Sequence, residues 1–438
     1  MSTRRMARRA TAIAPRRTAR VNSKSSVGAR TRDECNTMST AQLVSMGFAS
    51  PPAYPQMELC ARQARALALE GVAHERFMRI ASTSAIETRC VAAEIAAILD
   101  ASTSDRMRMF APIARTIALS AAQEALARAN VDPARVTDLV IATCTGFAAP
   151  GLHCDLVEQL GLAPSTRPLQ LGFMGCFGGV AALRTARALA SSDPDAVVLV
   201  IAVELCSLHF RRSGAHDALI SFSLFGDGAS CAIVMGSDAT ATNTPCMGML
   251  EYPRTQLLGG RDLMSWSIED DGFAMTLGRA VPTEIEQATP HLQGLASADA
   301  VAVHPGGVAI LDAVERALAF SSSSRHSQPF RRDATDAGDL ADAREVLRTT
   351  GNTSSGAIFR VANRILCRNL EARRTEPTRE RVVLLAKTNS GEQTAYRESV
   401  QGQRLRSDLT PDGQLARQLD LLAFGPGLTA DLVRIRMQ

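Results

Sequence analysis

The sequence predicts an α/β fold built from layers of helices and strands. Residues 195–205 form an almost continuous apolar run, as expected of a strand that is buried on both faces of a sheet. Further strands are predicted at 136–143 and 229–235, and helices, from Ala and Leu at helical spacing, at 57–70, 113–129 and 180–190. Strands that alternate with helices are typical of a layered α/β fold.

The same pattern starts again after about residue 240. A strand is predicted at 298–303, followed by helices at 308–319, 343–350 and 355–370. This repetition suggests two duplicated α/β halves that face each other. We therefore divide the chain into a basic leader or tail (1–40), a first half (41–240) and a second half (241–438).

Composition excludes several classes of function. The 438 residues are 46% hydrophobic, which is enough for a large core, and the net charge of +4 with only 4% aromatic residues does not indicate a nucleic-acid partner. No run of roughly 18 apolar residues is present, so no membrane span is predicted. The 10 cysteines include no C-x-x-C pair, which argues against zinc and favours reduced thiols.

Residues 1–32 contain no Asp or Glu and are rich in Arg, Ser, Thr and Ala. This composition is typical of an organelle transit peptide. A disordered basic tail or an over-long start of the reading frame explains it as well. The expected location is therefore the cytoplasm, or a plastid or mitochondrion if the segment is a transit peptide.

Cys176 lies at the end of an apolar, glycine-rich stretch, LGFMGCFGGV, directly before the predicted helix at 180–190. At a helix start, unpaired backbone N–H groups and the helix dipole favour an anion, which for cysteine is the thiolate. A thiolate attacks acyl groups, so Cys176 is a candidate nucleophile. The alternative is an ordinary buried cysteine, a common core residue.

Two polar residues stand at similar corners in the second half. His304 follows a predicted strand in HPGG, and Asn352 follows a predicted helix in GNTSSG. Thiolate, imidazole and carboxamide form a coherent set for acyl transfer, because the imidazole can pair with the thiolate and both partners can hold an oxyanion. Taken singly, His304 could be a hydrogen-bonded core residue and Asn352 a helix cap.

At this point the sequence resembles the type III polyketide synthases, the chalcone synthase-like enzymes of the thiolase fold, from about residue 48 onward. The motifs that carry the resemblance are GFMGCFGG (172–179), LFGDGAS (224–230), AVHPGG (302–307), GNTSSG (351–356) and FGPGLT (424–429). It implies duplicated halves in an α-β-α-β-α arrangement and a homodimer. It also implies decarboxylative condensation of an acyl-CoA starter with malonyl-CoA and cyclisation of the product, with CoA thioesters as substrates and no bound cofactor or metal.

The resemblance assigns roles to the residues already singled out. Cys176 resembles the acyl-carrying nucleophile, and His304 and Asn352 resemble its partners in activation and malonyl decarboxylation. Phe225 resembles the aromatic gate between the CoA tunnel and the cavity, with core packing as the alternative. Asp227, in the same motif, is equally explained as a turn residue before a glycine.

Arg76 and Arg79 match basic residues that meet the CoA phosphates at the tunnel mouth, with a solvated surface as the alternative. Thr83 stands where the family has a third basic residue, which implies weaker affinity for CoA.

The positions that line the family's cavity are Cys144, Cys206, His209, Met275 and Ser354. The plant pattern has Thr at the first three and a second Phe in place of Met275, so starter choice and chain length are expected to differ here. Cys144 resembles bacterial members, some of which make tetrahydroxynaphthalene. The flexible Met275 leaves room for a longer acyl starter, so an alkylpyrone- or alkylresorcinol-type product is expected, with tetrahydroxynaphthalene- or chalcone-type products as alternatives.

Two segments depart from the family pattern, at 321–341 and 387–423. Residues 421–423 repeat the Leu-Leu-Ala of 384–386, so the second segment is either a surface insertion that interrupts a core strand or a gene-model artefact. Two rival functions remain open at this point. One is a ketoacyl synthase III-like initiation enzyme, and the other is a non-catalytic thiolase-fold scaffold.

Overall fold

The computed structural model describes residues 40–437, apart from residues 94, 240–245, 294, 296–297, 324–339 and 376–416. Its strands are β1 (Gln42–Ala49), β2 (Ala53–Pro55), β3 (Thr88–Cys90), β4 (Asp138–Thr143), β5 (Arg167–Gly172), β6 (Val197–Leu205), β7 (Asp227–Met235), β8 (Gly248–Leu257), β9 (Met264–Glu269), β10 (Gly272–Leu277), β11 (Ala300–Val303), β12 (Gln418–Gly425) and β13 (Thr429–Arg436). Its helices are α1 (Gln56–Ala66), α2 (Gly71–Ser82), α3 (Ile95–Leu99), α4 (Thr103–Ala129), α5 (Leu152–Leu160), α6 (Gly178–Ser192), α7 (His216–Leu224), α8 (Val281–Ala288), α9 (Val308–Ser323), α10 (Ala341–Thr350) and α11 (Ala357–Thr375).

The large sheet confirms the predicted duplication. Its nine strands lie in the order β11-β12-β13-β8-β1-β7-β6-β4-β5. In the first half β1 pairs antiparallel with β7, β7 antiparallel with β6, and β6 parallel with β4. In the second half β8, β13, β12 and β11 repeat the same sequence of two antiparallel pairings and one parallel pairing. The two sets join where β1 pairs briefly with β8.

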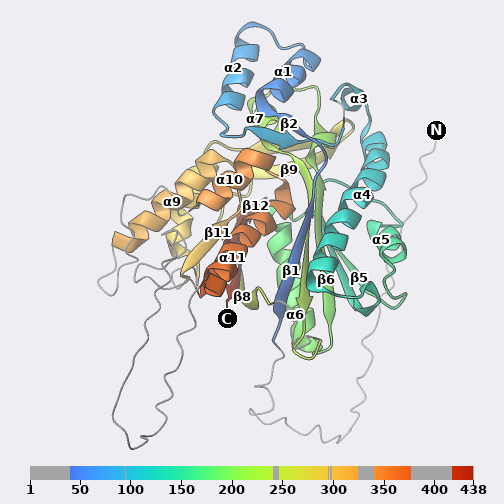
Figure 1. The fold of residues 1–438 in the computed structure, drawn as a ribbon. Helices are drawn as coiled ribbons and strands as arrows, with labels where there is room; N and C mark the ends of the chain where they lie inside the picture. The colour runs from blue at the N-terminus through green and yellow to red at the C-terminus, as the bar shows by residue number, and fades with distance from the viewer. Residues whose placement is uncertain are drawn as a thin grey trace, which may run out of the picture. The chain divides into compact units, whose positions relative to one another are not determined.

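Two helices lie between the halves and bury apolar side chains against both. Helix α6 contacts β4 and β6 of the first half and β8, β12 and β13 of the second, and α11 contacts β1, β7, β11 and β12. Helix α4 covers the other face of β1, β6 and β7 (Figure 1). Strands β4, β6 and β7 are buried along their whole length, as expected of strands covered by helices on both faces.

Helices α6 and α11 approach each other most closely at their amino ends. A Cβ on Gly179 would lie 2.1 Å from the carbonyl oxygen of Ser355, so only glycine fits there. Ser355 belongs to the short 3-10 helix η7 (Ser354–Gly356), which leads into α11. This backbone contact brings the end of the 171–180 stretch against the GNTSSG motif.

Several predicted elements extend further than the sequence pattern indicated. The helix predicted at 113–129 begins at Thr103, where Ser102 and Asp105 form a capping box, and it continues through Pro112. The sequence did not predict helix α2 or the β9–β10 hairpin. Among the described residues, no helix combines the length and the apolar character needed to cross a membrane.

The second proposed insertion has different bounds from those expected. Residues 418–423 form most of β12, with Leu419, Leu421 and Leu422 fully buried, so they belong to the core and not to an insertion. The strand is therefore continuous into Gly425. Residues 1–32, 382–386, most of 321–341 and residues 387–416 lie outside the described residues.

Candidate active site

Cys176 lines a cavity of about 500 Å³ between the strand ends of the first half, α7 and the β9–β10 hairpin. Six of the other sequence-predicted residues line it as well: Cys144, Cys206, His209, Phe225, Met275 and Ser354. These residues come from segments up to 210 positions apart (144 to 354), so the fold gathers them as the resemblance implied. His304 and Asn352 are buried and do not line this cavity themselves.

Cys176 lies in the short 3-10 helix η3 (Gly175–Phe177), directly before α6. Gly175 has φ +68°, and a Cβ there would lie 2.3 Å from Cδ of Pro426, so the turn before the thiol requires glycine. The Cys176 Sγ lies 3.8 Å from the Ser354 hydroxyl oxygen. The position matches the expected loop-to-helix corner.

The expected resting thiolate does not match the electrostatics. Burial raises the pKa of the Cys176 thiol to about 12, and hydrogen bonds from Ser354 and Asn352 lower it by less. Loss of hydration therefore outweighs the helix amino terminus as an influence on this sulfur. In the free protein Cys176 is a neutral thiol at neutral pH.

His304 follows β11 and is held by its backbone, whose N–H donates to the carbonyl of Leu422 on β12 at 2.8 Å. The side chain is only 2% exposed, and within the described part of the chain neither ring nitrogen has a hydrogen-bond partner. Burial lowers the pKa of His304 to about 3, so the imidazole is neutral. The ring nitrogens are open to a group that enters the site, but the low pKa makes the imidazole a weak base in the free protein.

Asn352 is fixed by the strand-like bridge that it forms with Phe225. Its N–H donates to the carbonyl of Leu224 at 3.0 Å, and its own carbonyl accepts from the N–H of Gly226 at 2.9 Å. Its side-chain oxygen accepts from the backbone N–H of Ser354 at 2.9 Å, and the side chain lies close enough to Cys176 to lower the pKa of its thiol. The backbone hydrogen bonds therefore hold Asn352 and the segment around Phe225 in a fixed position relative to each other.

The segments that carry Cys176, His304 and Asn352 pack on one another through Leu224 and Phe177. The loop that follows His304 packs on Leu224, since a Cβ on Gly307 would lie 3.5 Å from its Cδ1. The end of β12 packs on η3, where a Cβ on Gly425 would lie 2.4 Å from the ring of Phe177. The segments that carry the thiol, the imidazole and the amide thus pack on common elements, but no hydrogen bond joins the His304 ring to Cys176.

A buried carboxylate that sequence reasoning missed supports the cavity floor. Glu204, at the end of β6, accepts hydrogen bonds from the N–H of Cys144 at 3.0 Å and from the hydroxyls of Thr145 at 2.7 Å and Ser355 at 2.5 Å. Burial raises its pKa, and these hydrogen bonds lower it. The signal in the sequence was a single charge at the end of an apolar run.

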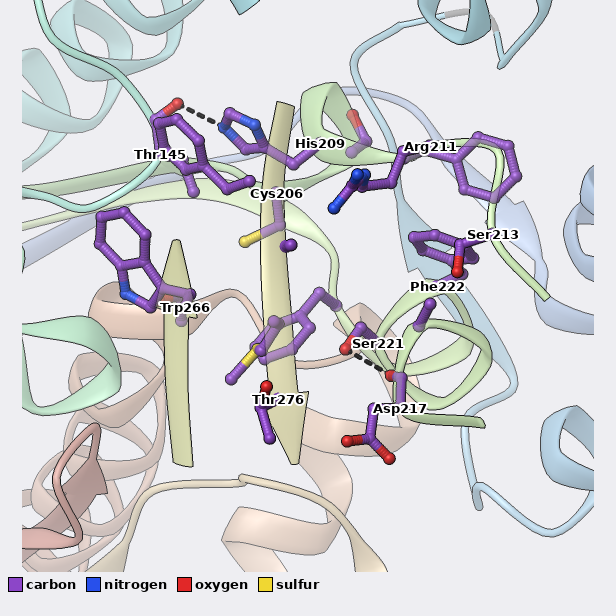
Figure 2. Close-up of a pocket in the computed structure, with 18 of the residues that line it drawn as sticks. Thr145, Cys206, His209, Arg211, Ser213, Asp217, Ser221, Phe222, Trp266 and Thr276 are labelled. Carbon is purple, nitrogen blue, oxygen red and sulfur yellow. Dashed lines mark hydrogen bonds between the residues drawn. The ribbon is translucent and has the colours of Figure 1, made fainter. Parts of the chain in front are cut away.

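The wall opposite α7 is aromatic. His209 stacks on Phe273 with ring centroids 3.8 Å apart, and Phe273 stacks on Trp266 at 5.0 Å. Nε2 of His209 donates to the carbonyl of Thr145 at 2.7 Å (Figure 2). Burial lowers the pKa of His209 to about 4, so this ring is also neutral.

Trp266 and Phe273 were not predicted from sequence. Trp266 is the one tryptophan of the chain and pairs across the hairpin with Met275. The space that Met275 leaves in the cavity, where the plant pattern has Phe, is thus partly filled by the larger ring of Trp266 on β9. Period-two alternation on both sides of the Glu-Asp-Asp-Gly turn at 269–272 could have indicated the hairpin.

The proposed CoA-binding residues lie outside the cavity. Arg76, Arg79 and Thr83 are exposed on or just after α2, which packs against α7, a helix of the cavity wall. Asp227 is not a turn residue: it is the first residue of β7, is buried, and accepts hydrogen bonds from Ser207 and from the N–H of Ala92. In the described part of the chain, no three His, Cys, Asp or Glu side chains cluster as metal ligands.

Comparison with known proteins identifies the family of this chain. Residues 29–239 match the family description "Chalcone and stilbene synthases, N-terminal domain". The 1,3,6,8-tetrahydroxynaphthalene synthase of Streptomyces griseus is 32% identical over 47% of this chain and 57% of its own length. The alpha-pyrone synthesis polyketide synthase-like Pks18 of Mycobacterium tuberculosis is 30% identical over 57% of this chain and 67% of its own length.

Known structures show the same fold. The crystal structure of PKS-I from the brown alga Ectocarpus siliculosus matches 92% of this chain and 100% of its own with a TM-score of 0.74, at 22% identity. The chain matches little more than half the length of the tetrahydroxynaphthalene synthase, but two thirds of the Mycobacterium relative at 30% identity. The chain belongs to the family of chalcone and stilbene synthases, the type III polyketide synthases.

Proposed function

We propose that this chain is an acyltransferase that condenses an acyl-CoA starter with malonyl-CoA and cyclises the product. One observation carries the proposal: the thiol of Cys176 opens to a cavity of about 500 Å³ and lies beside a fixed amide, Asn352, which lowers its pKa. A cavity of this volume is typical of small-molecule sites. The names of the relatives, which include tetrahydroxynaphthalene and alpha-pyrone synthases, support the reaction class.

In the loading step, the neutral imidazole of His304 accepts the proton of the Cys176 thiol. The thiolate attacks the starter thioester, the acyl–sulfur bond to CoA breaks, and the imidazolium returns the proton to the CoA thiolate. The pKa values of about 12 for the thiol and about 3 for the imidazole make this transfer unfavourable in the free protein. Thiolate formation is therefore expected to accompany substrate binding.

In the extension step, malonyl-CoA loses CO2 and leaves an enolate whose oxygen carries the negative charge. The amide N–H of Asn352 and a ring N–H of His304 are suited to hold that oxygen, since fixed donors in a buried site stabilise developing charge. The enolate carbon attacks the acyl thioester, a C–C bond forms, and the Cys176 thiolate is released for the next round. Phe225, which lines the cavity and is bridged to Asn352, is suited to act as the gate between the CoA entrance and the cavity.

Substrate entry is proposed beside α2 and α7. Arg76 and Arg79 offer two exposed guanidinium groups for the phosphates of CoA, and α7 carries cavity residues including Asp217 and Ser221. The aromatic wall of Trp266 and Phe273 limits the space beside Met275, so we favour compact pyrone- or naphthalene-type products. A starter with a long acyl chain would have to place that chain on another side of the cavity.

We also propose that the protein is a homodimer. Strand β5 is the last strand of the nine-stranded sheet, and its other edge therefore presents backbone N–H and C=O groups. Leu169 on this strand is 43% exposed. Phe173, four residues later, and Phe147, whose ring centroid lies 6.2 Å from that of Phe173, are also exposed. A second copy related by a two-fold axis would pair the same edges and cover these side chains.

Labelled malonyl-CoA with a panel of acyl-CoA starters is expected to give labelled cyclic products identified by mass. Cys176→Ala should abolish them, whereas Cys231→Ala, at a core thiol on β7, should not. Product formation by Cys176→Ala would contradict the assignment. Absence of products with every starter supports the scaffold, and activity only with malonyl on an acyl carrier protein supports the ketoacyl synthase III-like alternative.

The protonation state of Cys176 is testable by alkylation with iodoacetamide in the absence of substrate. Because only the thiolate reacts, a thiol of pKa about 12 should be labelled about tenfold faster for each pH unit between about pH 7 and pH 10. The rate is read by peptide mass, with the exposed Cys154 as internal reference. A rate that is already constant near pH 7 would show a resting thiolate–imidazolium pair instead.

Truncation of the aromatic wall should change the product. Trp266→Ala is expected to enlarge the cavity beside Met275 and to shift the product masses toward longer starters or additional extensions. Trp266→Phe keeps a ring in the wall and should leave the distribution close to that of the parent protein. An unchanged distribution in Trp266→Ala would show that this wall does not limit the product.

The proposed dimer is testable by light scattering at micromolar protein. The parent chain should have twice the monomer mass, and Leu169→Asp should give monomers because a charge would be buried on each side. Leu257→Asp, at a leucine 76% exposed on β8, is the matched control and should stay dimeric. A monomeric parent chain would refute the proposal.

A further inference from the structure

Arg89 is among the largest fully buried side chains of the protein, with 2% of its surface exposed. It lies on the short strand β3 and lines the Cys176 cavity. Burial lowers its pKa, yet an arginine remains charged in proteins. A buried charge without an ion-pair partner at contact distance is unusual, so its contacts need an explanation.

All five N–H donors of this guanidinium have an acceptor. Nε donates to the Gln56 side chain at 2.9 Å. One terminal nitrogen donates to the carbonyls of Phe222 and of Phe225, the latter at 2.9 Å. The other donates to the Gln63 side chain at 3.1 Å and to Sγ of Cys60 at 3.7 Å. Three acceptors thus belong to α1, and two are backbone carbonyls at the end of α7.

The stem of Arg89 passes beside the loop that carries Asn352. A Cβ on Gly351 would lie 3.0 Å from Cγ of Arg89, and Gly351 has φ +69°, so glycine is required for the arginine and the loop to coexist. A Cβ on Gly226 would lie 3.2 Å from the same atom. Arg89 therefore touches both strands of the Phe225–Asn352 bridge and ties that bridge to α1.

We propose that Arg89 is a positioning residue that holds Phe225 and Asn352 as one rigid unit at the cavity, an inference that rests on the proposed function for their roles in the reaction. Five fixed acceptors allow one orientation of a planar guanidinium, whereas an ammonium group at the same place could satisfy at most three. Loss of Arg89 releases the two α7 carbonyls and frees the bridge to shift. A shift of about 1 Å at a reacting group is enough to cost on the order of 100-fold in rate.

The variants are Arg89→Met, which keeps the stem and removes every donor, and Arg89→Lys, which keeps the charge. Arg62→Met is the matched control, since Arg62 is exposed on α1. The first readout is amide hydrogen exchange followed by peptide mass, which needs no catalysis. Both Arg89 variants should exchange faster over 222–226 and 350–354, where Gly226 and Asn352 donate across the bridge, and Arg62→Met should not.

The second readout is kinetic. The kcat for malonyl-CoA decarboxylation is expected to fall about 10- to 100-fold in Arg89→Lys, with the KM for malonyl-CoA changed far less. Alkylation of Cys176 should change far less than kcat, because burial, which dominates the pKa of this thiol, is retained in Arg89→Lys. A fall in kcat that is matched by a rise in KM and by a change of similar size in the alkylation rate would show a merely structural role and would overturn the proposal.

The two proposals fail in different ways. If the parent chain does not decarboxylate malonyl-CoA, the proposed function fails, and hydrogen exchange still decides whether Arg89 positions the bridge. If Arg89→Met does not fold, Arg89→Lys carries the test alone. Unchanged exchange over 222–226 and 350–354 in a folded Arg89 variant would overturn the inference even in an active enzyme.

Discussion

The site depends on one close backbone contact between the two halves. Gly179 at the start of α6 allows the carbonyl of Ser355 to approach to a distance that no side chain would permit. Through this contact the turn that carries Cys176 lies against the turn that carries Asn352 and Ser354. Glu204 reinforces the arrangement because its carboxylate binds Ser355 from one half and Cys144 and Thr145 from the other side of the cavity. Packing of the two central helices therefore fixes the chemistry.

Burial keeps the thiol of Cys176 and the imidazoles of His209 and His304 neutral. Cys176 stays protonated, and His209 and His304 stay deprotonated, because each is buried and charge would lose hydration without a partner. Arg89, which also lines the cavity, is charged, but its donors are all satisfied away from the thiol. The groups proposed to react therefore carry no charge at rest. Charge appears when a thioester enters and supplies groups that stabilise it.

The sequence was sufficient for the fold class and the duplication, because these follow from apolar periodicity, and its resemblance to a known family pointed to seven of the residues that line the cavity. Cys176, shortly before α6, and Asn352, shortly after α10, stand in motifs that carry this resemblance. The protonation state of Cys176 could not be predicted, since it depends on how completely distant segments exclude water. Trp266 and Arg89 were missed because their roles arise from cross-strand and tertiary contacts that have no short-range signal.

The place where β12 begins has an engineering consequence. The strand runs from Gln418, near the end of the segment that departs from the family pattern, to Gly425, which packs against the Cys176 turn. Eight residues of extended chain separate these ends by about 25 Å. Insertions or deletions before Gln418 therefore join the end of β12 that lies farther from the Cys176 turn. A reporter domain or affinity handle grafted there would leave the reacting groups undisturbed.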